Sequence, residues 1–118
     1  MRIIETLGAQ GEIRMFRVDE VPARATPMNK ENGHFIIGHS ETGHHHVLEA
    51  ERVSVFADPD APQGMTILYA ILDSAGSLNH LRSHDTHAPH AFDPGDVIMF
   101  RTDREYDPYE ELARRVAD

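Results

Sequence analysis

Turn-forming residues interrupt this chain at intervals of about 8 to 15 residues, and this rhythm constrains its fold more than any other feature. The stretches between the turns are short apolar or alternating runs. Such a pattern favours a mainly β fold, as a meander, sandwich or barrel, over a helical bundle. Because 118 residues is the usual size of one domain, we expect a single β-rich domain over residues 1–118.

The expected strands are the apolar and alternating runs between these turns. The run 65–72 is continuously apolar and is expected to be the central strand. Residues 79–90 contain Pro89 and several polar residues, so we interpret them as a loop or an irregular strand that leads into 91–92. The remaining strands are expected at 2–7, 12–18, 35–37, 44–48, 52–57 and 96–101, with a hairpin between the first two.

The C-terminal residues differ in character from the rest of the chain. Asp107 is a suitable helix N-cap, and Pro108 suits the first helical turn. Leu112 and Val116 are four residues apart and would share one face of a helix. This pattern predicts one short C-terminal α-helix at about 108–117.

The composition and charge of the chain exclude several classes of site and partner. Cysteine is absent, which excludes disulfides and thiolate sites and fits a reducing cytoplasm. The N-terminal residues do not resemble a signal peptide, and the longest apolar run, 67–72, is too short to cross a membrane. The net charge is −9 and Lys30 is the single lysine, so no basic stripe could bind nucleic acid or anionic lipid. We therefore expect a cytoplasmic protein without nucleic-acid or membrane partners.

Histidine is unusually frequent, and eight of the nine histidines fall in two groups. Side chains alternate along a strand, so His44 and His46 would share one face and His45 would lie on the other. Neutral imidazole is a common ligand of divalent ions. We therefore predict that His44 and His46 bind a divalent metal ion, which could be zinc, iron, manganese or nickel. The two groups are His39, His44, His45 and His46, and His80, His84, His87 and His90.

A third metal ligand is expected from the second group, because a catalytic zinc ion typically has three protein ligands and a water. We predict His87 as this ligand, with His84 and His90 as alternatives. Asp85 could accept the ring proton of a ligand histidine and fix its orientation. The competing interpretation is that these histidines are half-exposed strand and loop residues that do not act together.

The segment Gly38-His39-Ser40-Glu41-Thr42-Gly43-His44-His45-His46 resembles the first motif of the cupin superfamily. Gly38, His44 and His46 match that motif in order and spacing. Glu51 falls at the spacing allowed for the glutamate of the motif, and Glu49 comes one residue too early. The resemblance implies a cupin-like small β-barrel, the double-stranded β-helix, with a metal ion in its mouth and a glutamate as an additional ligand.

A second stretch, Asp93-Pro94-Gly95-Asp96-Val97, resembles the turn that leads into a late cupin strand. The histidine that follows this turn in cupins has no counterpart in 98–106, and His87 would take its place. Cupins include dioxygenases, isomerases, decarboxylases and non-enzymatic binders. The resemblance therefore implies a small-molecule ligand and leaves open whether the protein is an enzyme. It also implies a homodimer, the commonest oligomer.

A fainter resemblance spans most of the chain. Residues 38–46, the step His87-Ala88-Pro89 and the segment 104–108 together resemble a group of small uncharacterised proteins of phages and prophages. This resemblance implies a mobile-element origin and no known activity. The alternative function is thus a non-catalytic or regulatory β module that self-associates through exposed strand edges and the C-terminal helix, with structural histidines.

Overall fold

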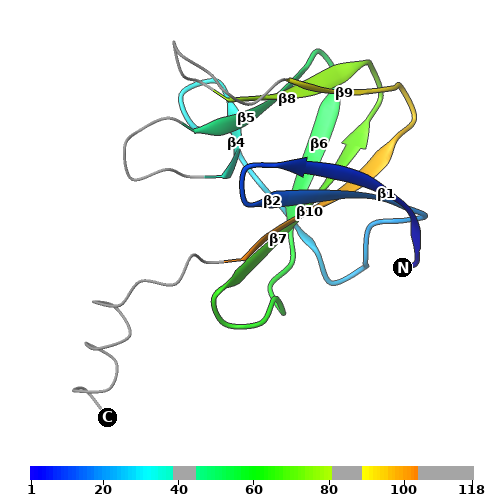
Figure 1. Ribbon diagram of the computed structural model, residues 1–118, viewed down its shortest axis with the longest axis vertical. Coiled ribbons are helices and arrows are strands. Elements are labelled where there is room, and N and C mark those ends of the chain that lie inside the picture. Colours follow the sequence, from blue (N-terminus) through cyan, green and yellow to red (C-terminus); the bar gives the residue numbers. More distant parts are fainter. Residues whose placement is uncertain (39–44, 81–88, 104–118) are drawn as a thin grey trace.

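The chain forms two antiparallel β-sheets (Figure 1). The structure is a computed structural model and describes residues 1–38, 45–80 and 89–103. Its strands are β1 (Ile3–Gln10), β2 (Ile13–Val18), β3 (Thr26–Pro27), β4 (Phe35–Gly38), β5 (His46–Ala50), β6 (Val53–Ala57), β7 (Met65–Leu72), β8 (Gly76–His80), β9 (His90–Phe92) and β10 (Val97–Asp103). The larger sheet has the order β1-β2-β10-β7-β6-β3, and the smaller sheet has the order β4-β5-β8-β9.

The prediction of a mainly β fold is confirmed. β7 coincides with the apolar run 65–72 and lies between β10 and β6 in the larger sheet. The predicted hairpin forms from β1 and β2, and Gly11 in its turn has a φ of 59°. The strand β8 was not predicted, because Leu78 is the single large apolar residue in its sequence.

The two sheets do not close into a barrel. Within the described ranges, the larger sheet ends at β1 and β3, and the smaller sheet ends at β4 and β9. The barrel that the segment 38–46 implied is therefore not confirmed. The predicted helix at 108–117 lies outside the described residues. None of the elements in the described part of the chain is a helix long and apolar enough to cross a membrane.

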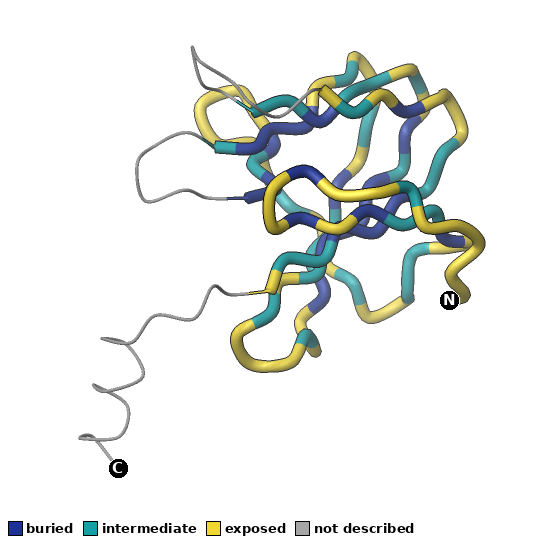
Figure 2. The backbone as a smooth tube through the Cα atoms, viewed as in Figure 1, coloured by how far each residue is buried: buried dark blue, intermediate teal, exposed yellow. Residues whose placement is uncertain are grey.

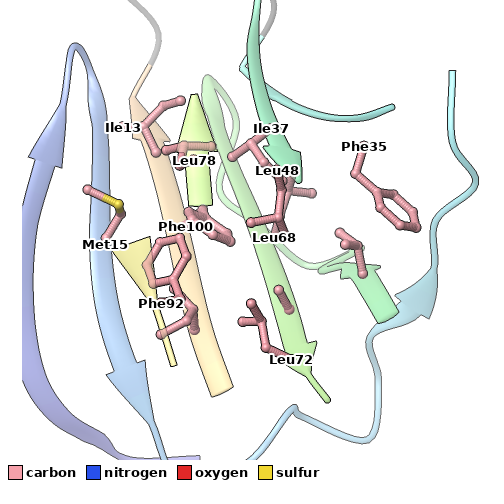
Figure 3. Close-up of a cluster of buried hydrophobic side chains, with 13 residues drawn as sticks. Ile13, Met15, Phe35, Ile37, Leu48, Leu68, Leu72, Leu78, Phe92 and Phe100 are labelled. Carbon is pink, nitrogen blue, oxygen red and sulfur yellow. The ribbon is translucent and has the colours of Figure 1, made fainter. Parts of the chain in front are cut away.

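The main apolar core contains residues from both sheets (Figure 3). Met15 of β2 and Phe100 of β10 belong to it from the larger sheet, and Leu48 of β5 and Leu78 of β8 belong to it from the smaller sheet. Both Phe100 and Leu78 are fully buried. Figure 2 shows buried stretches along most of the strands and exposed stretches at the turns, whereas β1 and β3 are largely exposed. Removal of these side chains from water is the main favourable contribution to folding.

A second apolar cluster covers the outer face of the larger sheet. Along β7, Leu68 and Ala70 belong to the main core, whereas Tyr69 between them belongs to the outer cluster. Burial on both faces explains why the sequence of β7 is continuously apolar rather than alternating. The outer cluster consists of Val18, Tyr69 and Met99, with Val21 and Ala25 among the residues packed against it.

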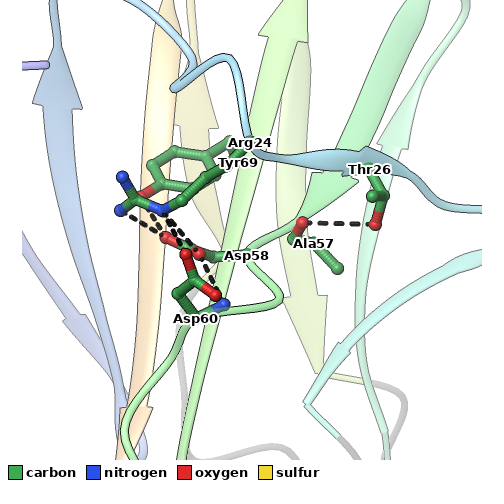
Figure 4. Close-up of polar contacts among 6 residues, drawn as sticks. All are labelled: Arg24, Thr26, Ala57, Asp58, Asp60 and Tyr69. Atoms are coloured by element: carbon green, nitrogen blue, oxygen red, sulfur yellow. Dashed lines mark hydrogen bonds and ion pairs between the residues drawn. The ribbon is translucent and has the colours of Figure 1, made fainter.

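An ion pair fastens the segment between β2 and β3 to this outer face (Figure 4). The carboxylate of Asp58 accepts hydrogen bonds from Nε and Nη2 of Arg24, at 2.9 and 2.8 Å. It also accepts hydrogen bonds from the hydroxyl of Tyr69 at 3.2 Å and from the backbone nitrogen of Asp60 at 3.0 Å. The bonds from Arg24 hold the pKa of Asp58 below its ordinary value of 3.8, and burial raises the pKa of Tyr69.

We expect Asp58→Asn to lower the free energy of unfolding by about 2 kcal/mol at neutral pH, because hydrogen bonds to a charged group contribute about 1.5–3 kcal/mol. The folded-state pKa of Asp58 is depressed. Its contribution is therefore present at pH values above 3.8 and is lost as the pH falls through the folded-state value. Urea unfolding at a series of pH values should show the two proteins converging in stability in acid.

The control for this measurement is Asp60→Asn. The side chain of Asp60 is 74% exposed and lies 3.7 Å from Nε of Arg24, so its loss should change stability little. A stability difference between wild type and Asp58→Asn that stayed constant down to strong acid would contradict the role of the carboxylate charge.

Candidate metal centre

Three histidines of the clustered groups lie on the inner face of the smaller sheet. His46 of β5 is directly opposite His80 of β8, and Leu78 of β8 is directly opposite His90 of β9. Directly opposed residues of antiparallel strands point to the same face, as do residues two apart on one strand. Leu78 belongs to the main core, so all three rings are on the face that meets the larger sheet.

These histidines mark strand ends. β5 begins at His46, β8 ends at His80 and β9 begins at His90. Because β5 and β8 are antiparallel and pair at His46 and His80, these ends lie at the same end of the smaller sheet. Residues 39–44 and 81–88, which include His39, His44, His84 and His87, adjoin these strand ends in the sequence.

His46 is buried, with 5% of its surface exposed, and its ring has polar and stacking partners. Its Nδ1 lies 2.7 Å from Oε1 of Gln10, the last residue of β1 in the larger sheet. Nε2 of Gln10 donates a hydrogen bond to the backbone oxygen of Leu78 at 2.9 Å, and Gln10 is 3% exposed. The ring of His80 stacks on that of His46, with centroids 4.4 Å apart and planes inclined by 15°. A polar bridge therefore links the two sheets beside a stacked pair of imidazoles.

His90 is half-buried beside the aromatic part of the core. Its ring centroid is 5.0 Å from that of Phe92 on the same strand. Phe92 in turn meets Phe100 edge to face, with centroids 5.8 Å apart. This arrangement anchors the start of β9 next to the end of β8.

Gly38 ends β4 opposite His46 and permits a close approach of the larger sheet. A Cβ atom at this position would lie 2.7 Å from Cδ1 of Ile13 and 3.4 Å from Cδ2 of His46. Ile13 is fully buried, so its side chain has little room to move. The absence of a side chain at Gly38 therefore lets Ile13 and His46 pack side by side.

The structure brings together some of the predicted site residues and separates others. His46 and His90 lie on the inner face of the smaller sheet, as described above. Glu49 is exposed, and because it is three residues from His46 on β5, its side chain points to the opposite face of the sheet. Glu51 is also exposed. His44, His84, Asp85 and His87 lie outside the described residues. In the described ranges, no group of three or more histidine, aspartate or glutamate residues is arranged to hold a metal ion.

Two residues of this site were missed by the sequence analysis. His80 is not among the predicted ligands, because residues 79–90 contain Pro89 and several polar residues and are interpreted as a loop or an irregular strand. Its place opposite His46 depends on the pairing of β8 with β5. Gln10 gave no signal at all, since nothing in the sequence indicates that the end of the first hairpin strand meets a histidine 36 residues later.

The model of the family described as "Domain of unknown function (DUF8820)" matches residues 9–104 of this chain. No curated protein and no solved structure matches this chain. The expectation of a cupin is therefore wrong, and so is the expectation of a relationship to the phage group.

Two of the features that suggested a cupin, Gly38 and the turn at 93–96, have local structural roles. Gly38 is required by the close approach of Ile13. The turn at 93–96 is stabilised by a hydrogen bond from the backbone nitrogen of Asp93 to Oδ2 of Asp96, at 2.9 Å. Gly95 adopts a φ of 88° in this turn. Glycine, proline and aspartate are suited to such turns in many unrelated folds. Their spacing is therefore not specific to cupins.

We expect Gly38→Ala to lower the free energy of unfolding by about 1–3 kcal/mol, the usual cost of overpacking a core. Ile13→Val removes the Cδ1 atom that the new methyl group would strike. The double variant should therefore be less destabilised than the sum of the two single variants, as measured by chemical denaturation.

The matched control is Ile98→Val, which shortens another fully buried isoleucine. Its cost should add to that of Gly38→Ala without coupling. If the stability losses of Gly38→Ala and Ile13→Val were also strictly additive, this result would contradict the close approach at Gly38.

Proposed function

We propose that this chain, which belongs to the DUF8820 family of unknown function, binds a divalent metal ion through His46. The observation that carries the proposal is the pairing of β5, β8 and β9, which supports a convergence of histidines at one end of the smaller sheet. A buried histidine with an ordered polar partner is a suitable metal ligand, because hydrogen-bonded ring orientation is the usual feature of such ligands.

The proposed ligand set combines both histidine groups. His46 is the central ligand, and His44 and His87 remain the predicted second and third ligands. His80 joins them as a candidate because it lies directly opposite His46 on the neighbouring strand. Imidazole ligands suit zinc, iron or nickel better than manganese, which favours oxygen ligands. An ion with an open coordination position would bind and polarise an oxygen-bearing small molecule.

Metal analysis tests the proposal on protein purified without an affinity tag or a nickel column. We expect zinc or nickel to bind wild type with near-unit stoichiometry in calorimetric titration. At about 100 times the dissociation constant, the metal should stabilise the fold by about 2.7 kcal/mol. His46→Ala should abolish both the binding and the stabilisation. The effect of the further variants identifies the other metal ligands: His44→Ala, His80→Ala and His87→Ala.

The matched control is His34→Ala, because His34 is an exposed histidine outside both groups. This variant should bind metal as wild type does. Because His46 is buried, its loss could unfold the protein, so circular dichroism of the metal-free variants is recorded in parallel. A folded wild-type protein that binds neither zinc nor nickel at neutral pH would overturn the proposal.

One observation favours a second candidate function, self-association as a β module. β1 is an edge strand that pairs on one side with β2. Its residues Ile3 and Ile4 are 47% and 57% exposed, and with Met1 they are the exposed large apolar residues of the described part. An edge strand with apolar side chains on both faces is a template for strand addition. The proposed occupant is β1 of a second copy, paired antiparallel to give a homodimer.

Sedimentation velocity over a range of protein concentrations, with a metal chelator present, tests this second candidate. Wild type should show a monomer–dimer equilibrium, and Ile4→Lys should shift it to monomer, because a charged side chain on an edge strand opposes pairing. Gln63→Lys adds the same charge at an exposed turn position and should not change the equilibrium. Monomeric wild type at all concentrations, or a dimer unaffected by Ile4→Lys, would rule it out.

A further inference from the structure

We infer that Gln10 is a positioning residue, which selects Nε2 of His46 as the atom that binds metal. The inference rests on the proposed function and deepens it, because it names the ligating atom and the residue that sets it. Gln10 lies on β1 in the larger sheet, far in sequence from both histidine groups.

The orientation of the Gln10 amide follows from its contact with β8. The backbone oxygen of Leu78 can only accept a hydrogen bond, and it lies 2.9 Å from the Gln10 side chain. The amide nitrogen must therefore face Leu78, since the reverse orientation would set two oxygens against each other. The amide oxygen then faces Nδ1 of His46, at 2.7 Å.

The protonation of the His46 ring follows in turn. An amide oxygen only accepts, so Nδ1 of His46 must carry the proton that it donates to Gln10. A neutral imidazole has one N–H group, and its lone pair is then on Nε2. Both Gln10 and His46 are at least 95% buried, so water does not readily replace the bond. The other tautomer would leave two acceptors facing each other, which disfavours it by roughly 10- to 100-fold.

The same hydrogen bonds connect the two stacked rings. Leu78 is two residues before His80 on β8, so Gln10 fixes the His46 ring against the strand that carries its stacking partner. The partner is also uncharged, unlike the carboxylate that often lies behind a zinc-binding histidine. A carboxylate at position 10 would set one oxygen against the backbone oxygen of Leu78, so a buried glutamate there would be protonated and would donate to Leu78 in place of the amide.

Nitrogen-15 NMR of metal-free wild type tests the tautomer directly, at about pH 8, where histidine is neutral. We expect His46, assigned by comparison with His46→Gln, to show a protonated Nδ1 and an unprotonated Nε2. Gln10→Leu, close in shape and unable to accept a hydrogen bond, should lose this signature. Gln10→Glu should keep it in its protonated form, in which the hydroxyl donates to Leu78 and the carbonyl oxygen accepts from Nδ1 of His46. A protonated Nε2 in wild type would overturn the inference whether or not the protein binds metal.

Zinc titration of the same proteins tests the effect on binding. Gln10→Leu should bind zinc about 10- to 100-fold more weakly, the usual effect of losing such a partner, and Gln10→Glu should bind about as tightly as wild type. Equal affinities in wild type and Gln10→Leu would contradict the positioning role. If wild type binds no zinc, the proposed function fails instead, and the NMR result separates the two outcomes. Should Gln10→Leu not fold, wild type and Gln10→Glu still supply both measurements.

Discussion

The apolar contact between the two sheets is the interaction on which the rest of the structure depends. Ile13 and Phe100 from the larger sheet and Leu78 from the smaller sheet are fully buried in it. This contact sets which face of each strand points inward. The histidines of β5, β8 and β9 lie on the same face as Leu48 and Leu78, so the packing of the core also decides that their rings point inward.

The sequence pattern predicts those elements whose burial leaves a local signature. β7 is buried on both faces and is continuously apolar, and the hairpin of β1 and β2 contains a glycine with positive φ in its turn. β8 could not be predicted in this way, because Leu78 is its one large buried side chain and its other residues are polar or small. Its identity as a strand comes from the neighbours on each side, β5 and β9.

In the candidate site, too, some residues have a local sequence signature and others depend on tertiary structure. The frequency of histidine identified His46 and His90 as candidate ligands. The partners of His46 depend on tertiary structure. His80 meets it through strand pairing, and Gln10 meets it across the gap between the sheets. No spacing along the chain encodes either contact, and so a motif of nearby residues pointed to the wrong superfamily.

The length of the turn in the first hairpin sets the orientation of the Gln10 side chain. Gly11 and Glu12 alone connect β1 to β2, and Gln10 pairs directly with Ile13 across this turn. Side chains alternate with a period of two, so one inserted residue that shifted this pairing would turn the Gln10 amide outward. The hydrogen bond of a buried ring on the opposite sheet is thus tied to the length of a surface turn. A chain with every histidine intact could lose the contact between Gln10 and His46 through a single insertion far from all of the histidines in sequence.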